Sequence, residues 1–257
     1  MLIEELLEDA VGKGASDIHI SANLPPVFRI DGKLIRTNME ALTAENVETL
    51  VFPILNNEQR RKLEQEWELD LSYGIHGLGR FRVNVYKNNG TYAAAFRTIN
   101  TQVPSFETLG LPPVVKKITE RPRGLILVTG PTGSGKSTTL ASMIDHINET
   151  RNEHILTIED PVEFVHKSKK SVVHQRELGQ DTRSFANALK SALREDPDII
   201  LVGEMRDLDT ISLAITAAET GHLVMGTLHT SSASQTIDRI IDVFPQGQQQ
   251  QIRIMLS

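Results

Sequence analysis

The fold is decided by one stretch of this sequence, Gly130-Pro131-Thr132-Gly133-Ser134-Gly135-Lys136-Ser137-Thr138. It matches the phosphate-loop pattern G-x-x-x-x-G-K-[ST] at every fixed position. Residues 124–129, just before it, form a short apolar run that predicts a buried strand, and residues 137–147 place apolar side chains at helical spacing. A strand, a glycine-rich loop and a helix in this order direct backbone N–H groups toward phosphate oxygens.

The loop therefore predicts a site for a nucleoside triphosphate. All nine loop residues, from Gly130 to Thr138, are candidates for binding the nucleotide. Lys136 is expected to reach the β- and γ-phosphates, and the Ser137 hydroxyl is expected to bind Mg²⁺. The alternative is a glycine-rich turn with a chance lysine, but it does not account for the elements on both sides.

Beyond the loop, predicted strands alternate with predicted helices. This alternation is typical of βαβ units and indicates an α/β domain with a mostly parallel sheet. The predicted strands are 124–129, 154–158, 198–202 and 222–228, and the predicted helices are 135–149, 183–195, 207–219 and 233–242.

Before the loop, the pattern predicts a separate α+β domain with an antiparallel sheet. Asp31-Gly32 between two strand-like runs is a strong hairpin signal. Residues 100–114 lack periodicity and are expected to link the two domains. The predicted helices here are 2–11, 44–52 and 57–66, and the predicted strands are 17–21, 27–30, 33–36, 69–75, 80–86 and 91–99.

An apolar run at residues 198–202 leads into Gly203 and Glu204. In open α/β sheets the ligand binds at the carboxyl ends of the parallel strands, so Glu204 is expected beside the phosphate loop. There it could hold Mg²⁺ or polarise the attacking water. Many buried strands end in an acidic residue, and it is the loop upstream that favours the catalytic interpretation.

A second run, residues 155–158, leads into a cluster of acids at Glu159, Asp160 and Glu163. Carboxylates this close repel one another unless a cation or hydrogen-bond donors lie near them. Glu163 and Glu159 are therefore the candidates for the general base. The alternative interpretation is a solvated turn at Asp160-Pro161.

Two histidines bracket a third apolar run, with His222 before it and His229 after it. A strand of this length places them at opposite ends and on opposite faces, so they are not expected to share a metal. His229, at the carboxyl end, is a candidate for contacting or sensing the γ-phosphate. His222 is expected to be structural or to lie between subunits.

The composition argues against several classes of protein. The chain has 27 Lys and Arg against 33 Asp and Glu, a net charge of −6, which counts against binding nucleic acid. It has no cysteine, so disulfides and thiolate zinc sites are excluded and a cytoplasmic location is expected. No apolar run is long enough to predict membrane insertion. The apolar-rich end, residues 252–257, predicts that the natural chain continues.

These signals together resemble the type II/type IV pilus superfamily of secretion ATPases. The matching motifs are GPTGSGKST, ILTIEDPVEF, DIILVGEMRD and GHLVMGTLHT in the second domain, and GASDIHI, PPVFRIDGKL and GRFRVNVY in the first. The resemblance spans essentially the whole chain. It implies a PAS-like domain at 1–99, a linker at 100–114 and a RecA-like ATPase domain at 115–257.

The resemblance also implies ATP and Mg²⁺ as ligands, with Ser137 and Glu204 at the metal. It implies a homohexameric ring in which ATP sits between domains and neighbouring subunits, and in which Arg82 and Arg97 reach the phosphates, with Arg80 a weaker match. In this sequence Arg82 and Arg97 fall on adjacent predicted strands, so one sheet face could present both.

Within the superfamily, the lack of cysteine and the start at the first helix favour the pilus-retraction branch over extension and secretion ATPases, which typically carry a four-cysteine zinc module. The implied function is ATP-driven pilus retraction and twitching motility. The implied partner is the inner-membrane pilus platform protein, which would hold the motor peripherally at the membrane. The alternatives are an accessory paralogue of the motor and a nucleotide-dependent assembly or regulatory module. The family continues past residue 257 with a helical region tied to retraction.

Overall fold

The computed structural model describes residues 2–99 and 102–256. The chain divides into two compact units, Met1–Asn100 and Thr101–Ser257. The first two residues of the expected linker, 100 and 101, lie outside the described residues, as do the first and last residues of the chain. Each unit is described by itself below.

The first unit contains a six-stranded antiparallel sheet in the order β3-β2-β1-β6-β5-β4. Its core lies on one face of the sheet, where Leu6, Val47 and Leu63 from the helices pack with Val83 and Phe96 from the strands. The elements are α1 (Ile3–Gly12), β1 (Asp17–Ser21), β2 (Val27–Ile30), β3 (Lys33–Arg36), α2 (Ala44–Val51), the short 3₁₀ turn Phe52–Ile54, α3 (Asn57–Glu66), β4 (Glu68–Ile75), β5 (Gly79–Asn88) and β6 (Thr91–Ile99).

Sequence alternation explains which face of this sheet is buried. Along β5, Phe81, Val83 and Val85 are buried, whereas Arg82 between them is exposed. A strand turns successive side chains to opposite faces, so its polar residues lie together on the other face. The predicted hairpin is confirmed: β2 pairs with β3 through a two-residue turn at Asp31-Gly32, where φ is 48° and 76°.

The second unit contains a five-stranded, all-parallel sheet in the order β7-β11-β10-β8-β9. The predicted fold class is confirmed: an antiparallel α+β unit is followed by a parallel α/β unit. The elements are α4 (Val114–Thr119), β7 (Gly124–Thr129), α5 (Lys136–Thr150), β8 (His154–Glu159), β9 (Val172–Glu177), α6 (Phe185–Ala192), β10 (Ile199–Val202), α7 (Leu208–Glu219), β11 (Leu223–Leu228), α8 (Ala233–Asp242) and α9 (Gln246–Met255).

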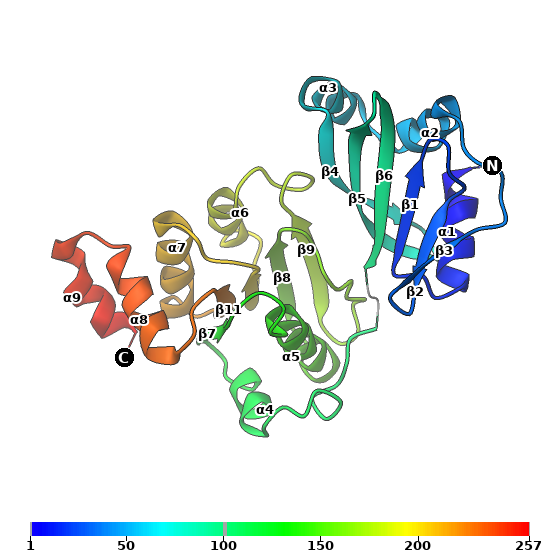
Figure 1. Cartoon of the computed structure of the whole chain (residues 1–257). Coiled ribbons are helices and arrows are strands. Elements are labelled where there is room, and N and C mark those ends of the chain that lie inside the picture. The colour runs from blue at the N-terminus through cyan, green and yellow to red at the C-terminus, as the bar shows by residue number, and fades with distance from the viewer. Residues whose placement is uncertain (1, 100–101, 257) are drawn as a thin grey trace. The chain divides into compact units, whose positions relative to one another are not determined.

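Helices cover both faces of the parallel sheet, as Figure 1 shows. On one face, Ile144 and Ile147 of α5 pack on Ile199 and Leu201 of β10. On the other face, alternate strand residues pack against α6, α7 and α8. The central strands β10 and β11 are buried along their whole length, which explains why β10 is entirely apolar and β11 has Thr227 as its one polar residue.

Besides the 3₁₀ turn Phe52–Ile54, three elements of the described residues were not predicted from the sequence. Strand β9 lies at the sheet edge and contains only two apolar residues, Val172 and Val173, so its pattern does not stand out. Helix α4 has six residues, and its bounds begin within the expected linker. Helix α9 is rich in glutamine, and only Ile252 within it is buried. Each of these elements is short, polar or at an edge, where hydrophobic periodicity is weak.

Candidate functional site

The phosphate loop begins where β7 ends and closes where α5 begins. Gly135 caps α5 with φ at 89°, a left-handed conformation that glycine adopts without strain. At Gly130, where φ is 150°, an added Cβ would lie 2.6 Å from Ser134 Oγ. The glycines thus let the loop turn tightly and leave its backbone N–H groups at the start of α5 available to an anion.

Lys136 is the first residue of α5, and its side chain folds back over the loop. Its Nζ donates to the carbonyl oxygens of Gly130 and Pro131, both at 3.0 Å. These carbonyls hold the ammonium group close to the loop, within the region where phosphates are expected. A bound triphosphate would give this cation anionic acceptors in place of neutral ones.

A cavity of about 540 Å³ adjoins the loop. The strands β8 and β10 are neighbours and run in parallel, so their carboxyl ends meet at this edge of the sheet. The predicted residues that line the cavity are Thr132, Gly133, Gly135, Lys136, Ser137, Thr138, Glu159, Glu163, Glu204 and His229. Three other loop residues, Gly130, Pro131 and Ser134, are not among the described residues that line it.

Glu204 follows β10 and is held in place by the neighbouring strand ends. The Gly203 N–H donates to the Ile158 carbonyl at 2.8 Å, and Thr227 Oγ1 donates to the Gly203 carbonyl at 2.5 Å. The Glu204 side chain is 15% exposed, and its carboxylate forms an ion pair with Arg206. Its position at the cavity is therefore fixed by the backbone, and its charge is partly compensated.

His229 lies directly after β11, with Nε2 3.7 Å from Glu204 Oε2. The structure thus places His229 both next to Glu204 and at the wall of the cavity. His222 lies at the other end of the strand, where its Nδ1 is 3.0 Å from the Ala217 carbonyl near the end of α7. The two histidines are separated as the strand spacing predicts.

Glu159 and Glu163 differ in their surroundings although both line the cavity. The Glu159 carboxylate accepts hydrogen bonds from Thr157 Oγ1 at 2.6 Å and from Gln175 Nε2 at 3.2 Å. Burial raises the pKa of Glu159, against the lowering effect of these bonds. Glu163 is exposed. Glu163 is thus the carboxylate with free access to a ligand.

Sequence reasoning missed several residues of the cavity wall. Arg206 lies two residues beyond Glu204, and Phe164 and His166 lie one and three residues beyond Glu163. The side chain of His166 is 3% exposed, and burial lowers its pKa. The signal for all three was proximity to a recognised motif, but neither charge nor spacing distinguished them from ordinary neighbours.

In the first unit, Arg82 of β5 lies directly opposite Arg97 of β6. The expected common face is therefore present. Arg97 Nε donates to Asp17 Oδ1 at 2.8 Å, while the Arg97 side chain remains 71% exposed. The weaker match, Arg80, donates from Nε to Ser72 Oγ at 2.8 Å.

Among the described residues, no three His, Cys, Asp or Glu side chains are grouped in a way that could hold a metal ion. Across residues 2–99 and 102–256, no helix combines the length and apolar character needed to cross a membrane.

A phosphate loop at the edge of a parallel sheet, with carboxylates at the neighbouring strand ends, defines a P-loop nucleotide-binding protein. The family described as Type II/IV secretion system protein matches residues 1–253, and this chain belongs to it.

Individual members of the family are closely similar to this chain. It is 57% identical over 257 residues to the type IV pilus retractation ATPase PilT of Pseudomonas aeruginosa, covering all of this chain and 75% of that protein. It is 58% identical over 232 residues to a twitching motility protein of Neisseria gonorrhoeae, covering 90% of this chain and 62% of that protein. It is 40% identical over 257 residues to the type IV pilus ATPase PilU of Pseudomonas aeruginosa, covering 100% of this chain and 67% of that protein.

Solved structures agree with this assignment. The pilus retraction motor PilT with bound ADP superposes with a TM-score of 0.93 at 54% identity, covering 100% of this chain and 75% of that one. The ATPase DotB of Legionella pneumophila superposes with a TM-score of 0.87 at 34% identity, covering 99% and 72%.

Proposed function

We propose that this chain is the ATPase of a type IV pilus retraction motor, which drives twitching motility by hydrolysing ATP. The observation that carries the proposal is the meeting of the phosphate loop, Glu163 and Glu204 at one cavity. The relatives support the choice within the family, since identity is 57% to the retraction ATPase and 40% to PilU. A PilU-like accessory ATPase remains the second candidate, on the strength of that 40% identity.

In this proposal the loop residues 130–138 bind the phosphates of ATP. Their backbone N–H groups and the N-terminus of α5 supply positive electrostatic potential, and Lys136 transfers its hydrogen bonds from the loop carbonyls to phosphate oxygens. Glu163, the exposed carboxylate, orients the attacking water and accepts its proton. Glu159 supports it, and His229 senses the γ-phosphate beside Glu204.

The residues present also fit Mg²⁺. Ser137 and Glu204 both line the cavity and offer hard oxygen donors, which Mg²⁺ prefers. Few protein ligands are needed, because Mg²⁺ in phosphoryl-transfer sites keeps waters and binds the substrate phosphates. When bound, Mg²⁺ would neutralise charge that develops on the phosphates. Glu204 would then exchange its contact with Arg206 for one with the cation or its water.

We further propose that Arg82 and Arg97 bind phosphate oxygens of the nucleotide in the assembled protein. Their side chains share one face of the antiparallel sheet, and an arginine in this role stabilises charge on the transferred phosphoryl group. The domain assignment belongs to the same proposal: a PAS-like domain at 1–99, a linker at 100–114 and a RecA-like ATPase domain at 115–257.

The assembly proposed is a homo-oligomer, a hexameric ring. Its partner would be the inner-membrane pilus platform protein, so the motor would be cytoplasmic and peripheral at the inner membrane. We propose neither nucleic-acid binding nor direct membrane insertion, in line with a net charge of −6.

The test is release of inorganic phosphate from ATP by the purified protein with Mg²⁺. Turnover that is lost in both Lys136→Ala and Glu163→Gln supports the proposal. Tight ATP binding without phosphate release would favour a nucleotide-dependent assembly or regulatory module. A second test expresses the chain in two mutant cells, one that lacks its retraction ATPase and one that lacks only the accessory ATPase. Restoration of twitching in the first cell but not in the second would distinguish the motor from the PilU-like alternative.

A further inference from the structure

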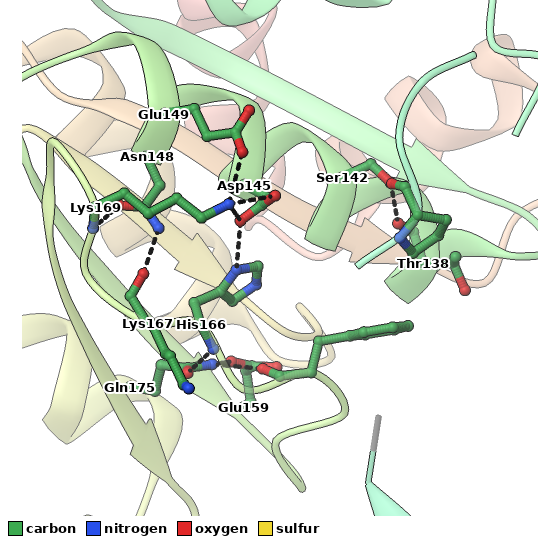
Figure 2. Close-up of polar contacts among 12 residues, drawn as sticks. Thr138, Ser142, Asp145, Asn148, Glu149, Glu159, His166, Lys167, Lys169 and Gln175 are labelled. Carbon is green, nitrogen blue, oxygen red and sulfur yellow. Dashed lines mark hydrogen bonds and ion pairs between the residues drawn. The ribbon is translucent and has the colours of Figure 1, made fainter. Parts of the chain in front are cut away.

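The side-chain amide of Gln175 makes three hydrogen bonds, one to the last residue of β8 and two to the segment that joins β8 to β9. Its Nε2 donates to Glu159 Oε1 at 3.2 Å and to the Phe164 carbonyl at 2.9 Å. Its Oε1 accepts from the His166 N–H at 2.8 Å. Figure 2 shows Gln175 beside Glu159 and beneath His166. One amide thus contacts both the end of β8 and the middle of this segment.

The far end of the same segment is fixed to α5. Asn148 Nδ2 donates to the Lys167 carbonyl at 2.8 Å, and Asn148 Oδ1 accepts from the Lys169 N–H at 2.9 Å. Lys169 Nζ adds contacts of 2.7 to 2.9 Å to Asp145 and Glu149 on the helix (Figure 2). This end of the segment is therefore tied to the last turns of α5. The near end is held by Gln175 and also by Glu177, whose Oε2 accepts from the Val162 N–H at 3.1 Å.

Glu159 connects this clamp to the candidate base. Its carboxylate also accepts a hydrogen bond from Thr157 Oγ1, and the nearby backbone N–H of Glu163 lowers the pKa of Glu159. A carboxylate held by two side-chain donors, with the Glu163 N–H beside it, is an anchor for the turn at 160–163 more than a free base. That turn carries the exposed Glu163 at the cavity.

We propose that Gln175 is a positioning residue for ATP hydrolysis: it holds Glu159, and through Glu159 it fixes the turn that presents Glu163 to the nucleotide. Gln175 is itself not among the described residues that line the cavity, so it acts through its neighbours. The inference rests on the proposed function, because it assigns Gln175 to the same site.

The kinetic test compares Gln175→Leu, Gln175→Glu and the control His174→Gln in the full chain. Leucine removes all three hydrogen bonds. Glutamate keeps an acceptor for the His166 N–H but, as a carboxylate, cannot donate to Glu159. Misplacement of a catalytic group by about 1 Å can lower the rate about 100-fold. We expect both Gln175 variants to lower kcat by about 10- to 100-fold while KM for ATP stays within about threefold of the wild-type value. The control His174→Gln should retain wild-type kcat, because the His174 ring contacts His154 at the opposite end of the sheet.

Amide hydrogen exchange separates the contacts. The His166 N–H should exchange faster in Gln175→Leu but remain protected in Gln175→Glu, and the Lys169 N–H, held by Asn148, should be unchanged in both. Wild-type kcat in Gln175→Leu would overturn the inference. Wild-type kcat in Gln175→Glu alone would also overturn it, because the clamp would then act only on the backbone of His166. If the wild-type protein does not hydrolyse ATP, the proposed function itself fails, which is a different result.

Discussion

Asp17 of β1 lies directly opposite Arg97 of β6, and the Arg97 Nε donates to Asp17 Oδ1 at 2.8 Å. On its other side Asp17 is opposite Arg29, whose Nε is 3.7 Å from Asp17 Oδ2. Arg82 continues the row beyond Arg97. The buried Asp17 carboxylate thus lies between Arg29 and Arg97 and holds the Nε atom of Arg97. The exposed end of the Arg97 guanidinium is left to contact other groups.

We predict that Asp17→Asn destabilises the protein in a pH-dependent way. Burial alone would raise the pKa of Asp17, but hydrogen bonds from Arg97 and Ser16 and the charges of Arg97 and Arg29 outweigh it and lower the pKa. A lowered carboxyl pKa gives stability that is present above the unfolded-state value and is lost as pH falls through the folded-state value. Because Arg97 is exposed, the expected loss at pH 7 is about 1 kcal/mol.

Urea unfolding at pH 7 and at pH 3 checks this prediction. The difference between wild type and Asp17→Asn should shrink at pH 3, where the carboxyl group begins to be protonated in both states. Asp9→Asn, which removes an exposed pair with Lys13, is the matched control and should change stability less. A difference that stays constant with pH would contradict the assignment of this effect to the Asp17 charge.

Glu159→Gln is predicted to stabilise the protein increasingly as pH rises. Burial raises the pKa of Glu159, so the wild-type protein loses stability as pH rises from the unfolded-state pKa through the folded-state pKa. The neutral amide does not carry this cost. Thermal unfolding at pH 5 and pH 8 should show the variant gaining relative to wild type at the higher pH. The exposed Glu219→Gln serves as the control, and an advantage confined to pH 5 would disprove the prediction.

Lys136→Ala should weaken ATP binding by about 100-fold, because each charge-assisted hydrogen bond to phosphate contributes about 1.5 to 3 kcal/mol. Titration with a fluorescent ATP analogue measures the affinity directly, and phosphate release gives the rate. Lys190→Ala on the exposed surface of α6 removes the same charge away from the cavity and should bind as wild type. Equal affinity of Lys136→Ala and Lys190→Ala would refute the placement of the triphosphate at the loop.

Glu163→Gln and Glu204→Gln should have different defects. Loss of a general base lowers kcat by about 10²- to 10⁴-fold, and Glu163→Gln should do so while still binding ATP. Glu204→Gln should instead raise the Mg²⁺ concentration needed for half-maximal ATP binding, since a metal-side carboxylate is lost. Turnover and the metal dependence of binding are measured separately. A Glu204→Gln protein with an unchanged Mg²⁺ requirement would remove Glu204 from the metal site.

Most of the fold could be predicted from local patterns. Strands such as β7 and β11 and the amphipathic helix α8 are long or regular enough for periodicity to identify them, and Asp31-Gly32 marks its hairpin. Strand β9 could not be identified in this way, because an edge strand with polar residues resembles a loop until its neighbour β8 is in place. Because β9 was not predicted, Gln175 within it was not recognised as a neighbour of the acidic cluster.

The same division holds for the candidate site. The spacing of the loop and the carboxylates at apolar strand ends determined, by themselves, that the phosphate loop and the acids would meet, because parallel strands bring their carboxyl ends to one edge. Sequence could not distinguish Glu159 from Glu163, since both are acids in one short cluster. Only tertiary structure decided that Glu159 is anchored by Thr157 and Gln175 while Glu163 is exposed at the cavity. Burial and hydrogen-bond partners depend on segments distant along the chain, and these set the chemistry of each carboxylate.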